Sequence, residues 1–209
     1  MSVDAAFSPA SGGGARQVWL IRHAQTEWSV NGRHTGRTDI PLTPTGIAAA
    51  EALRPWVRTV PFERVLSSPL SRAIDTARLC GLEAQVQPEP LLMEWDYGQY
   101  EGVTTHDIQA RAPGWDLWRD GCPGGETLEQ VSDRAHRLLA RIRSVPGNVA
   151  LFSHGHFSRL IIAAWLQLPA SRGRSFAIRA GSVSVLGFEH GNPVLWAAGD
   201  VPGTPGVGR

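Results

Sequence analysis

The sequence predicts an α/β fold in which a mostly parallel central sheet lies between two layers of helices, a three-layer α/β/α sandwich. Two observations lead to this prediction. Short apolar runs typical of buried strands alternate along the chain with stretches that carry helix start signals. Three of these runs end directly in polar residues, as strands of a parallel sheet do where they lead into loops. One domain is sufficient for 209 residues of which 42% are hydrophobic.

The first part of the chain contains two predicted strands and two predicted helices. Residues 18–21 and 64–66 are short apolar runs that read as buried strands. A helix is predicted over residues 43–57, because Thr43 is a good cap and the proline that follows it fits the first helical position. The same Ser-Pro type of signal predicts a second helix over residues 68–79, which a glycine then closes.

The second part of the chain supplies the remaining elements. Residues 149–152 form a third apolar run, and a helix is predicted over residues 157–166. Two closing strands are predicted at residues 183–188 and 194–197, joined as a hairpin by the turn residues 190–192. Strands that alternate with helices in this way are typical of an α/β sheet.

The predicted domain covers residues 17–199. Residues 1–16 and 200–209 are rich in small residues, proline and glycine and are interpreted as tails. Residues 96–127 are aromatic and rich in turn residues, so we interpret them as an insertion that covers the substrate over the carboxyl edge of the sheet.

Composition narrows the function classes. All 20 basic residues are arginine, which excludes the lysine of a Walker A phosphate loop and that of Schiff-base chemistry. A net charge of +1 and the lack of an apolar run near ~20 residues favour neither a nucleic-acid nor a membrane partner. Cys80 and Cys122 form no CxxC pair, so no disulfide framework or Cys-rich zinc site is indicated and a cytoplasmic location is expected.

Polar side chains suited to phosphate follow three of the predicted strands. Ligands of open α/β sheets bind beyond the carboxyl ends of the strands, and right-handed crossovers bring these ends to one edge. Guanidinium groups match phosphate oxygens, and helix N-termini favour anions. The sequence therefore predicts a phosphate pocket at that edge. The three strand ends are Arg22-His23, Ser67-Ser68 with Arg72 close behind, and Ser153-His154-Gly155.

Each of these groups also has a simpler interpretation. An Arg-His pair after a strand is often a surface turn, and Glu94 fits a solvated turn equally well. His154 and His156 have the spacing of a zinc pair, but no carboxylate lies within several residues and strand alternation would point the rings in different directions. The convergence of three strand ends favours the phosphate site. Other arginines at helical spacings are interpreted as solvated faces: Arg54, Arg58, Arg137, Arg141 and Arg143.

Five motifs, in the same order along the chain, resemble those of the histidine phosphatase (phosphoglycerate-mutase-like) superfamily. They are residues 20–28 (LIRHAQTEW, like LxRHGxTxW), 36–43 (GRTDIPLT, like GxxDxPLT), 67–77 (SSPLSRAIDTA, like SSPLxRAxxTA), 94–102 (EWDYGQYEG, like ExxxGxxEG) and 153–155 (SHG). Together they extend over nearly the whole predicted domain. Residues 94–98 and 153–159 most resemble the small acid phosphatases of actinobacteria.

The resemblance implies a metal-independent phosphomonoesterase that needs no cofactor and acts on a small-molecule phosphate ester. It implies His23 as the nucleophile that becomes phosphohistidine and Glu94 as the general acid. His23 must attack as neutral imidazole, which neighbouring arginines favour. Since the acid must carry a proton, we predict a mildly acidic optimum. The other implied catalytic residues are Arg22, Arg72 and His154, which would donate to the phosphoryl group if it is protonated. The implied substrate contacts are Ser29, Thr35, Gly36 and Gly155.

Two positions depart from the family pattern. Ala24 replaces the usual glycine, so a left-handed backbone is not expected there. Ser29 replaces a usual asparagine, and its shorter side chain is expected to hold the phosphoryl group less tightly. No role is assigned to His34, and the physiological substrate does not follow from the sequence.

Other functions compete with a phosphatase. A 2,3-bisphosphoglycerate-dependent phosphoglycerate mutase and a sugar (bis)phosphate phosphatase would use the same His23, whereas a silent regulatory relative would be expected to have lost it. A mutase must hold a doubly charged intermediate, yet residues 94–98 replace the mutases' Arg-His by Trp-Asp. We therefore predict little mutase activity, and interpret Tyr100, Trp115 and Trp118 as apolar surface for the substrate or as a small core of the insertion. Dimers are common among relatives, so a homodimer is one expected assembly.

Overall fold

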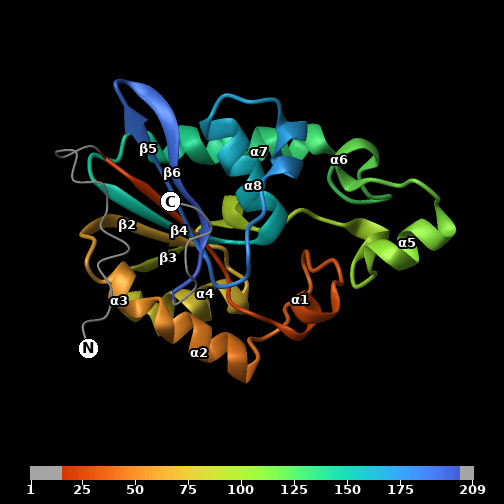
Figure 1. Ribbon diagram of the computed structural model, residues 1–209, viewed down its shortest axis with the longest axis horizontal. Helices are drawn as coiled ribbons and strands as arrows, with labels where there is room; N and C mark the ends of the chain where they lie inside the picture. Colours follow the sequence, from red (N-terminus) through yellow and green to blue (C-terminus); the bar gives the residue numbers. More distant parts are fainter. Residues whose placement is uncertain (1–15, 203–209) are drawn as a thin grey trace.

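The computed structural model describes residues 16–202, and these residues form one six-stranded sheet with helices on both faces (Figure 1). The strands lie in the order β3-β2-β4-β1-β5-β6. The neighbours from β3 to β1 are parallel, while β5 and β6 are antiparallel. The predicted mostly parallel α/β/α sandwich is therefore confirmed. The strands are β1 (Val18–Arg22), β2 (Phe62–Ser67), β3 (Val86–Pro88), β4 (Asn148–Ser153), β5 (Val183–Glu189) and β6 (Asn192–Asp200).

Two groups of helices cover the two faces of the sheet (Figure 1). One face is covered by α2 (Pro44–Ala52), α3 (Arg54–Val57), α4 (Ser71–Ala77) and the π-helical turn η1 (Arg78–Leu82). The other face is covered by α7 (Leu128–Ile142), α8 (Gly155–Trp165) and the 3-10 turn η4 (Ala170–Ser175). Beyond the carboxyl ends of the strands lie α1 (Glu27–Asn31), η2 (Pro90–Leu92), η3 (Gly98–Tyr100), α5 (Thr105–Arg111) and α6 (Leu117–Asp120).

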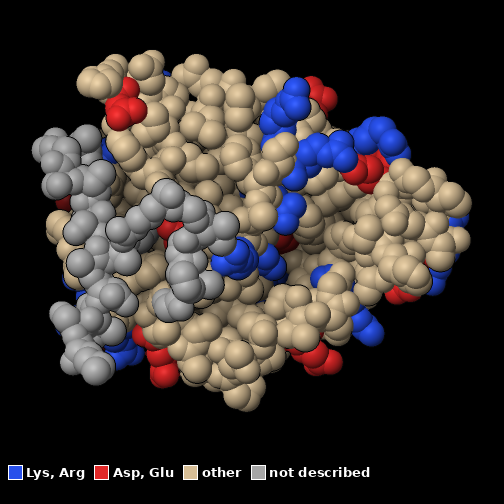
Figure 2. All heavy atoms as spheres, viewed as in Figure 1, with Lys and Arg blue, Asp and Glu red and all other residues tan. Residues whose placement is uncertain are grey.

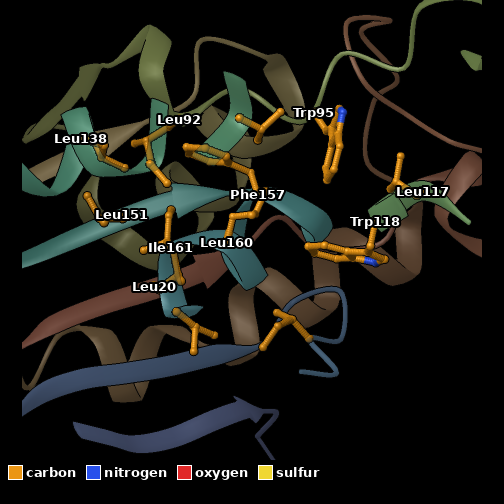
Figure 3. Close-up of a cluster of buried hydrophobic side chains, with 14 of the residues drawn as sticks. Leu20, Leu92, Trp95, Leu117, Trp118, Leu138, Leu151, Phe157, Leu160 and Ile161 are labelled. Carbon is orange, nitrogen blue, oxygen red and sulfur yellow. The ribbon is translucent and has the colours of Figure 1, made fainter. Parts of the chain in front are cut away.

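The alternation of side chains along β1 divides the core into two layers. Val18 and Leu20 join the cluster under α7 and α8, whereas Trp19 and Ile21 join the cluster under α2 to α4. Both clusters are almost completely removed from water. Figure 3 shows Leu20 beside the apolar face of α8. Because period-two alternation fixes which residue faces which layer, the register of β1 is strongly determined.

Two predicted helix boundaries are corrected by the structure. The helix predicted over residues 43–57 is capped by Thr43, whose Oγ1 accepts the Gly46 N–H at 3.0 Å, but it is divided into α2 and α3 at Leu53. Pro55 lacks the N–H that would continue the helical hydrogen bonds, which explains the division. The helix predicted to begin at residue 68 begins at Ser71.

The longest helix, α7, was not predicted as an element. Thr127 and Gln130 form a capping box at its start, in which each side chain bonds to the other residue's backbone N–H. Its Arg134 is buried. Arg141 lies on the solvated face, as predicted, with its side chain 63% exposed, and from there it pairs with the buried Glu89.

The ends of the predicted domain extend by one residue on each side. Arg16 donates to the carbonyl oxygens of Ile142 and Arg143, and Asp200 pairs with Val183 in the sheet. Residues 1–15 and 203–209 of the predicted tails lie outside the described residues. Among residues 16–202, none of the helices combines the length and apolar composition that a membrane span requires.

The aromatic residues of the insertion form its core rather than a surface. Trp115 and Trp118 are only 7% and 8% exposed, and Trp118 meets the Trp95 ring edge-on at 5.6 Å. Tyr100 meets Trp115 in the same way at 5.3 Å. Figure 3 shows Trp95 and Trp118 at the end of the main core cluster. The interpretation as apolar surface for the substrate is therefore wrong, and the small-core interpretation holds.

Candidate active site

The three predicted strand ends lie side by side. Strand β4 lies between β1 and β2 and is parallel to both, with Arg22 opposite Ser153 and Ser67 opposite Phe152. The His23 N–H donates to the Ser153 carbonyl oxygen at 2.9 Å, which continues the pairing one residue beyond β1. The polar residues that follow these strands therefore meet at one edge of the sheet, as predicted.

The His23 imidazole is buried and held in one tautomer. Its Nδ1 lies 2.8 Å from the Ala24 carbonyl oxygen, which can only accept, so Nδ1 carries the hydrogen. Nε2 then holds the free lone pair. Burial, followed by the charges of Arg72 and Arg22, lowers the pKa of His23 well below 6.5, while the bond to Ala24 opposes this shift. His23 therefore has the neutral form that a nucleophile requires.

Ala24 fits the site without strain. Within residues 16–202 the positive φ angles outside glycine occur at Gln167 and His190, so Ala24 has an ordinary backbone, as predicted. Its N–H donates to Thr76 Oγ1 at 3.0 Å. The carbonyl that orients His23 is thus itself held in place from α4.

Arg22 and Gly155 lie together at the start of α8. One Arg22 Nη donates to the Ile178 carbonyl oxygen at 2.6 Å, and its Nε is buried with no hydrogen-bond partner among the described residues. A Cβ on Gly155 would lie 3.1 Å from Arg22 Cζ, so glycine gives the guanidinium space beside the helix N-terminus. A cation with unused donors and the positive end of α8 both favour an anion here.

Arg72 is fully buried and most of its donors are used inside the protein. It donates to the carbonyl oxygens of Thr35 (3.2 Å), Gly36 (2.9 Å) and Thr38 (2.8 Å), and from Nε to His154 Nδ1 (3.2 Å). Its charge still lowers the pKa of His23. The structure thus places Arg72 as a buried cation that holds the loop after α1 and one histidine.

His154 has a different environment from the predicted one. Its Nδ1 accepts from Arg72, so Nε2 carries the hydrogen of the neutral ring and donates to Ser68 Oγ at 2.8 Å. Burial, then the charges of Arg72 and His23, lower the pKa of His154 well below 6.5. His154 thus has the neutral form, with its ring centroid 5.1 Å from that of His23, and it connects Arg72 to Ser68.

The Glu94 carboxylate lies at the N-terminus of α8. Oε1 accepts the N–H groups of Trp95 (2.9 Å) and Phe157 (2.8 Å), and Oε2 accepts the His156 N–H at 3.0 Å. Glu94 is only 4% exposed and lines the pocket that contains His23. Asp96, in contrast, pairs with Arg37 and lines a separate surface hollow. Of the two acids, the structure therefore places Glu94 beside the nucleophile.

Arg134 holds the segment that carries Glu94. Its guanidinium bonds to the Glu126 carboxylate and to the carbonyl oxygens of Leu91, Met93 and Glu94. It also lies 4.1 Å from the Phe157 ring centroid, next to the amide that binds Glu94. Sequence analysis did not single out Arg134, because an arginine on a polar helix gives no signal of burial.

Three of the predicted substrate contacts line the pocket: Gly155, Ser29 and Thr35. The Ser29 hydroxyl donates to the Thr26 carbonyl oxygen at 2.8 Å and accepts the Thr26 N–H at 2.9 Å, which completes the cap of α1. The Thr35 hydroxyl donates to the Arg33 carbonyl oxygen at 3.1 Å. Both hydroxyls therefore hold the backbone around α1 in place, and both residues also line the pocket.

Gly36 does not line the pocket among the described residues. Its N–H donates to both carboxylate oxygens of Glu101, at 2.9 and 3.0 Å, and a Cβ would lie 2.6 Å from one of them. Glycine is required there because the loop approaches the insertion closely. Gly36 thus joins the loop to the insertion, and its amide does not face the phosphate site.

The pocket has a volume of about 180 Å³ and includes residues that the sequence did not predict. Its remaining lining residues are Trp28, Gly32, Arg33, His34, Tyr97, Thr105, His156 and Arg159. His34 is 7% exposed and its Nδ1 donates to the Val103 carbonyl oxygen at 2.7 Å. Its ring stacks over that of His156 at 6.2 Å, and Tyr97 Oη lies 2.6 Å from His156 Nδ1. The outer wall is therefore polar, and His34, to which the sequence assigned no role, is part of it.

The zinc alternative for His154 and His156 finds no support in this arrangement. The two rings bond to different partners, Arg72 and Ser68 for one and Tyr97 for the other. Within residues 16–202 no three His, Cys, Asp or Glu side chains lie close enough to hold a metal ion. Burial, then the charges of Arg159 and His34, also lower the pKa of His156 well below 6.5.

Comparison with known proteins agrees with this site. The model of the histidine phosphatase superfamily (branch 1) matches residues 18–200. The chain belongs to this superfamily. Its five motifs therefore reflect common ancestry, and the prediction of an enzyme that acts on phosphate esters is confirmed.

Three relatives show the range of the superfamily around this chain. An acid phosphatase of Mycobacterium tuberculosis is 44% identical over 179 residues, covering 84% of this chain and 88% of that protein. A probable phosphoglycerate mutase of Salmonella choleraesuis is 30% identical over 202 residues, covering 88% and 93%. A solved structure from Mycobacterium tuberculosis superposes with a TM-score of 0.85 at 42% identity, covering 90% and 98%. The resemblance to actinobacterial acid phosphatases is thus confirmed.

Proposed function

We propose that this histidine phosphatase is a metal-independent phosphomonoesterase that transfers a phosphoryl group from a small-molecule ester to His23 and then to water. The observation that carries the proposal is the His23 tautomer. Its Nδ1–H is bonded to the Ala24 carbonyl, which leaves the Nε2 lone pair as the nucleophile in a pocket that also contains Arg22 and Glu94. The likeness to an acid phosphatase supports the same reaction.

The reaction has two steps. In the first, Nε2 of His23 forms a bond to phosphorus while the P–O bond of the ester breaks, and the departing oxygen takes a proton from Glu94. In the second, Glu94 takes a proton from a water molecule, whose oxygen bonds to phosphorus as the N–P bond breaks. The electron pair returns to Nε2, and inorganic phosphate leaves. Both steps place Glu94 on the open side of the phosphoryl group.

Charge stabilisation comes mainly from Arg22, since the His156 and Phe157 N–H groups at the N-terminus of α8 are bonded to Glu94. Arg22 keeps unused donors beside Gly155, where the equatorial oxygens of the phosphoryl group would lie. Arg72 adds its positive charge from behind and holds His154. Ser29 and Thr35 form the opposite wall. We assign His154 a positioning role, because its ring nitrogens are used by Arg72 and Ser68.

We place the enzyme in the cytoplasm because Cys80 and Cys122 are both free and buried. Burial raises the pKa of each thiol to about 12, so neither is a reactive thiolate at neutral pH. We also propose that the protein is a homodimer, because dimers are common among its relatives.

Mutase activity is the second candidate, and one observation favours it. The sequence analysis found few cations in the insertion, but the pocket also contains Arg33 and Arg159, which come from other elements. The test supplies 3-phosphoglycerate with catalytic 2,3-bisphosphoglycerate and follows 2-phosphoglycerate beside free phosphate. We expect phosphate release to dominate. Interconversion much faster than release would make the chain a mutase.

The phosphatase proposal is tested by brief exposure to radiolabelled substrate. We expect an acid-labile, alkali-stable phosphoprotein that is absent in His23→Ala. An acid-stable ester on Ser67 or Ser68 would contradict the proposal. Since the pocket histidines are bonded to protein groups, EDTA is expected to leave turnover of p-nitrophenyl phosphate unchanged. Loss of turnover that zinc or magnesium restores would overturn the metal-independent mechanism.

A further inference from the structure

The outer wall of the pocket contains two arginines that lack a carboxylate partner. Within residues 16–202, neither Arg33 nor Arg159 forms an ion pair. The only acidic residue among the pocket lining is Glu94, whose oxygens accept three backbone N–H groups. An unpaired arginine is not unusual in this chain, since Arg54 and Arg64 are also without an ion pair among the described residues, but Arg33 and Arg159 are unpaired in the pocket that contains His23. The pocket thus has an excess of positive charge.

Arg159 is the more informative of the two because it is partly buried. It lies on α8, one turn after His156, and its Nε is removed from water with no hydrogen-bond partner among the described residues. Burial is the main cause that lowers the pKa of His156, and the charge of Arg159 is the second cause. The charge of Arg159 also lowers the pKa of Arg22. Arg159 therefore lies close to both residues. A buried donor without a partner is costly, so its retention indicates a ligand group that completes it.

Arg33 also lines the pocket, from a different part of the chain. It follows α1, its side chain is exposed, and its guanidinium lies 5.9 Å from the Trp28 ring centroid. Figure 2 shows basic side chains along the hollow between the body of the molecule and the insertion. Arg33 and Arg159 therefore approach the pocket from different elements.

The phosphoryl group does not need these two arginines. Arg22 lines the pocket with His23, and the charges of Arg72 and Arg22 both act on the His23 ring. A phosphate dianion is balanced by two guanidinium groups. Two further cations in a pocket of about 180 Å³ therefore have capacity for another anion.

We propose that Arg159, with Arg33, forms a second anion subsite that binds an acidic group on the alcohol part of the substrate. The substrate class is a phosphomonoester with a second carboxylate or phosphate group. The fork of Arg159 would accept its oxygens, and Arg33 would add charge at the entrance. This subsite replaces the apolar substrate body expected from the sequence, since the tryptophans of the insertion are buried. The proposal rests on the proposed function of His23.

The test uses ω-carboxyalkyl phosphates with one to four methylenes between the two acids, each beside its neutral primary amide. Alkane bisphosphates of the same lengths form the second arm and distinguish a preference for phosphate from one for carboxylate. For the best length, we expect kcat/KM to favour the acid over the amide by about tenfold or more, the usual worth of a hydrogen bond to a charged group. Absence of any preference for acid at every length would overturn the proposal.

Variants locate the preference. Arg159→Gln is expected to lower kcat/KM for the acid about tenfold more than for the amide, Arg159→Lys to recover part of the ratio, and Arg33→Gln to lower it less. Arg64→Gln, an exposed arginine on β2, is the matched control and should keep the ratio. Equal losses for acid and amide in Arg159→Gln would place Arg159 in the phosphoryl site and contradict a second subsite.

Binding without turnover separates this proposal from the proposed function. Calorimetric titration of His23→Gln with the best acid and its amide should give the same preference as kcat/KM. A preference in binding without a phosphohistidine in the wild-type enzyme would leave the subsite supported and the phosphatase mechanism wrong. Phosphohistidine without a preference in binding would support the phosphatase mechanism and contradict the second subsite.

Discussion

The inner and outer halves of the pocket are built in different ways. Several inner residues follow a strand or begin a helix, as His23 follows β1 and Gly155 begins α8. The backbone of the sheet therefore fixes where these residues lie, whereas Glu94 is held by N–H groups of α8. The outer residues come from loops and helix faces far apart in sequence, such as His34, Tyr97 and Arg159. They are held by ring contacts and side-chain hydrogen bonds.

This difference separates chemistry from recognition. A substitution in the inner half should remove the reaction for every substrate, because the same atoms handle every phosphoryl group. A substitution in the outer half should change which alcohol is accepted. The following predictions test that division, from the largest expected effect to the smallest.

The largest effect is expected from the nucleophile. His23→Ala should lower turnover of p-nitrophenyl phosphate by about 10³-fold to 10⁶-fold, as removal of a covalent nucleophile does in other enzymes. His34→Gln, its counterpart in the outer half, should change kcat/KM by about tenfold or less, the worth of one hydrogen bond. Steady-state kinetics on both variants check this. Losses of similar size would mean that the two halves act as one unit.

Glu94→Gln is expected to have the next largest effect. It should lower hydrolysis of alkyl phosphates by about 10²-fold to 10⁴-fold, the usual worth of a general acid. Phosphorylation of His23 by p-nitrophenyl phosphate should suffer much less, because that leaving group departs without a proton. Single-turnover measurements with both substrates give the comparison. Equal losses would move the acid elsewhere, and Asp96 would be tested next although it lines a different hollow.

Arg134 tests whether the inner half depends on its support. Arg134→Met keeps the stem but removes the bonds to the segment that carries Glu94. We expect hydrolysis of alkyl phosphates to fall about tenfold, less than in Glu94→Gln. We also expect the free energy of unfolding to fall by about 3 kcal/mol, because Glu126 loses its partner.

The double variant Arg134→Met/Glu126→Gln controls for stability. Removal of the unpaired carboxylate should restore part of the free energy of unfolding, measured by denaturant titration, without restoring hydrolysis of alkyl phosphates. If the double variant recovers both, Arg134 is structural only.

The smallest effect concerns pH. Because burial and the charges of Arg72 and Arg22 lower the pKa of His23, its neutral form persists well below pH 6.5. The rate of His23 phosphorylation should therefore hold as the pH falls through 6.5, consistent with the predicted mildly acidic optimum. Single-turnover phosphorylation at a series of pH values measures this. A rate that falls with a midpoint at or above 6.5 would contradict a neutral His23.

Part of the inner half could be predicted from the sequence because its residues lie at or next to a strand end, whereas Glu94 lies well beyond the end of β3 and was implied by the family motif. Arg22, His23 and His154 follow apolar runs, and parallel pairing places such residues at one edge. Details that depend on side-chain hydrogen bonds did not follow. His154 is hydrogen-bonded to Arg72 and Ser68, and the Gly36 N–H is bonded to Glu101. These hydrogen bonds could not be predicted because they form only when the loop is folded.

The outer half could not be predicted for a physical reason. Arg33 and Arg159 carry no local signal of a pocket, and their proximity depends on how α1 and α8 pack against the insertion. The Trp residues of the insertion were interpreted as a possible substrate surface, because an aromatic residue in a loop-rich segment fits a surface or a small core equally well. The α8 spacing that places His156 and Arg159 one turn apart was the one available signal.

The central claim is that the Nε2 atom of His23 takes the phosphoryl group because Nδ1 is bonded to Ala24. The most direct measurement is the position of phosphorus on the ring of the trapped phosphoenzyme, by ³¹P–¹⁵N NMR of protein with labelled histidine. We expect a single signal from Nε2-phosphohistidine, lost in His23→Ala. Phosphorus on Nδ1, or on any residue other than His23, would contradict the mechanism.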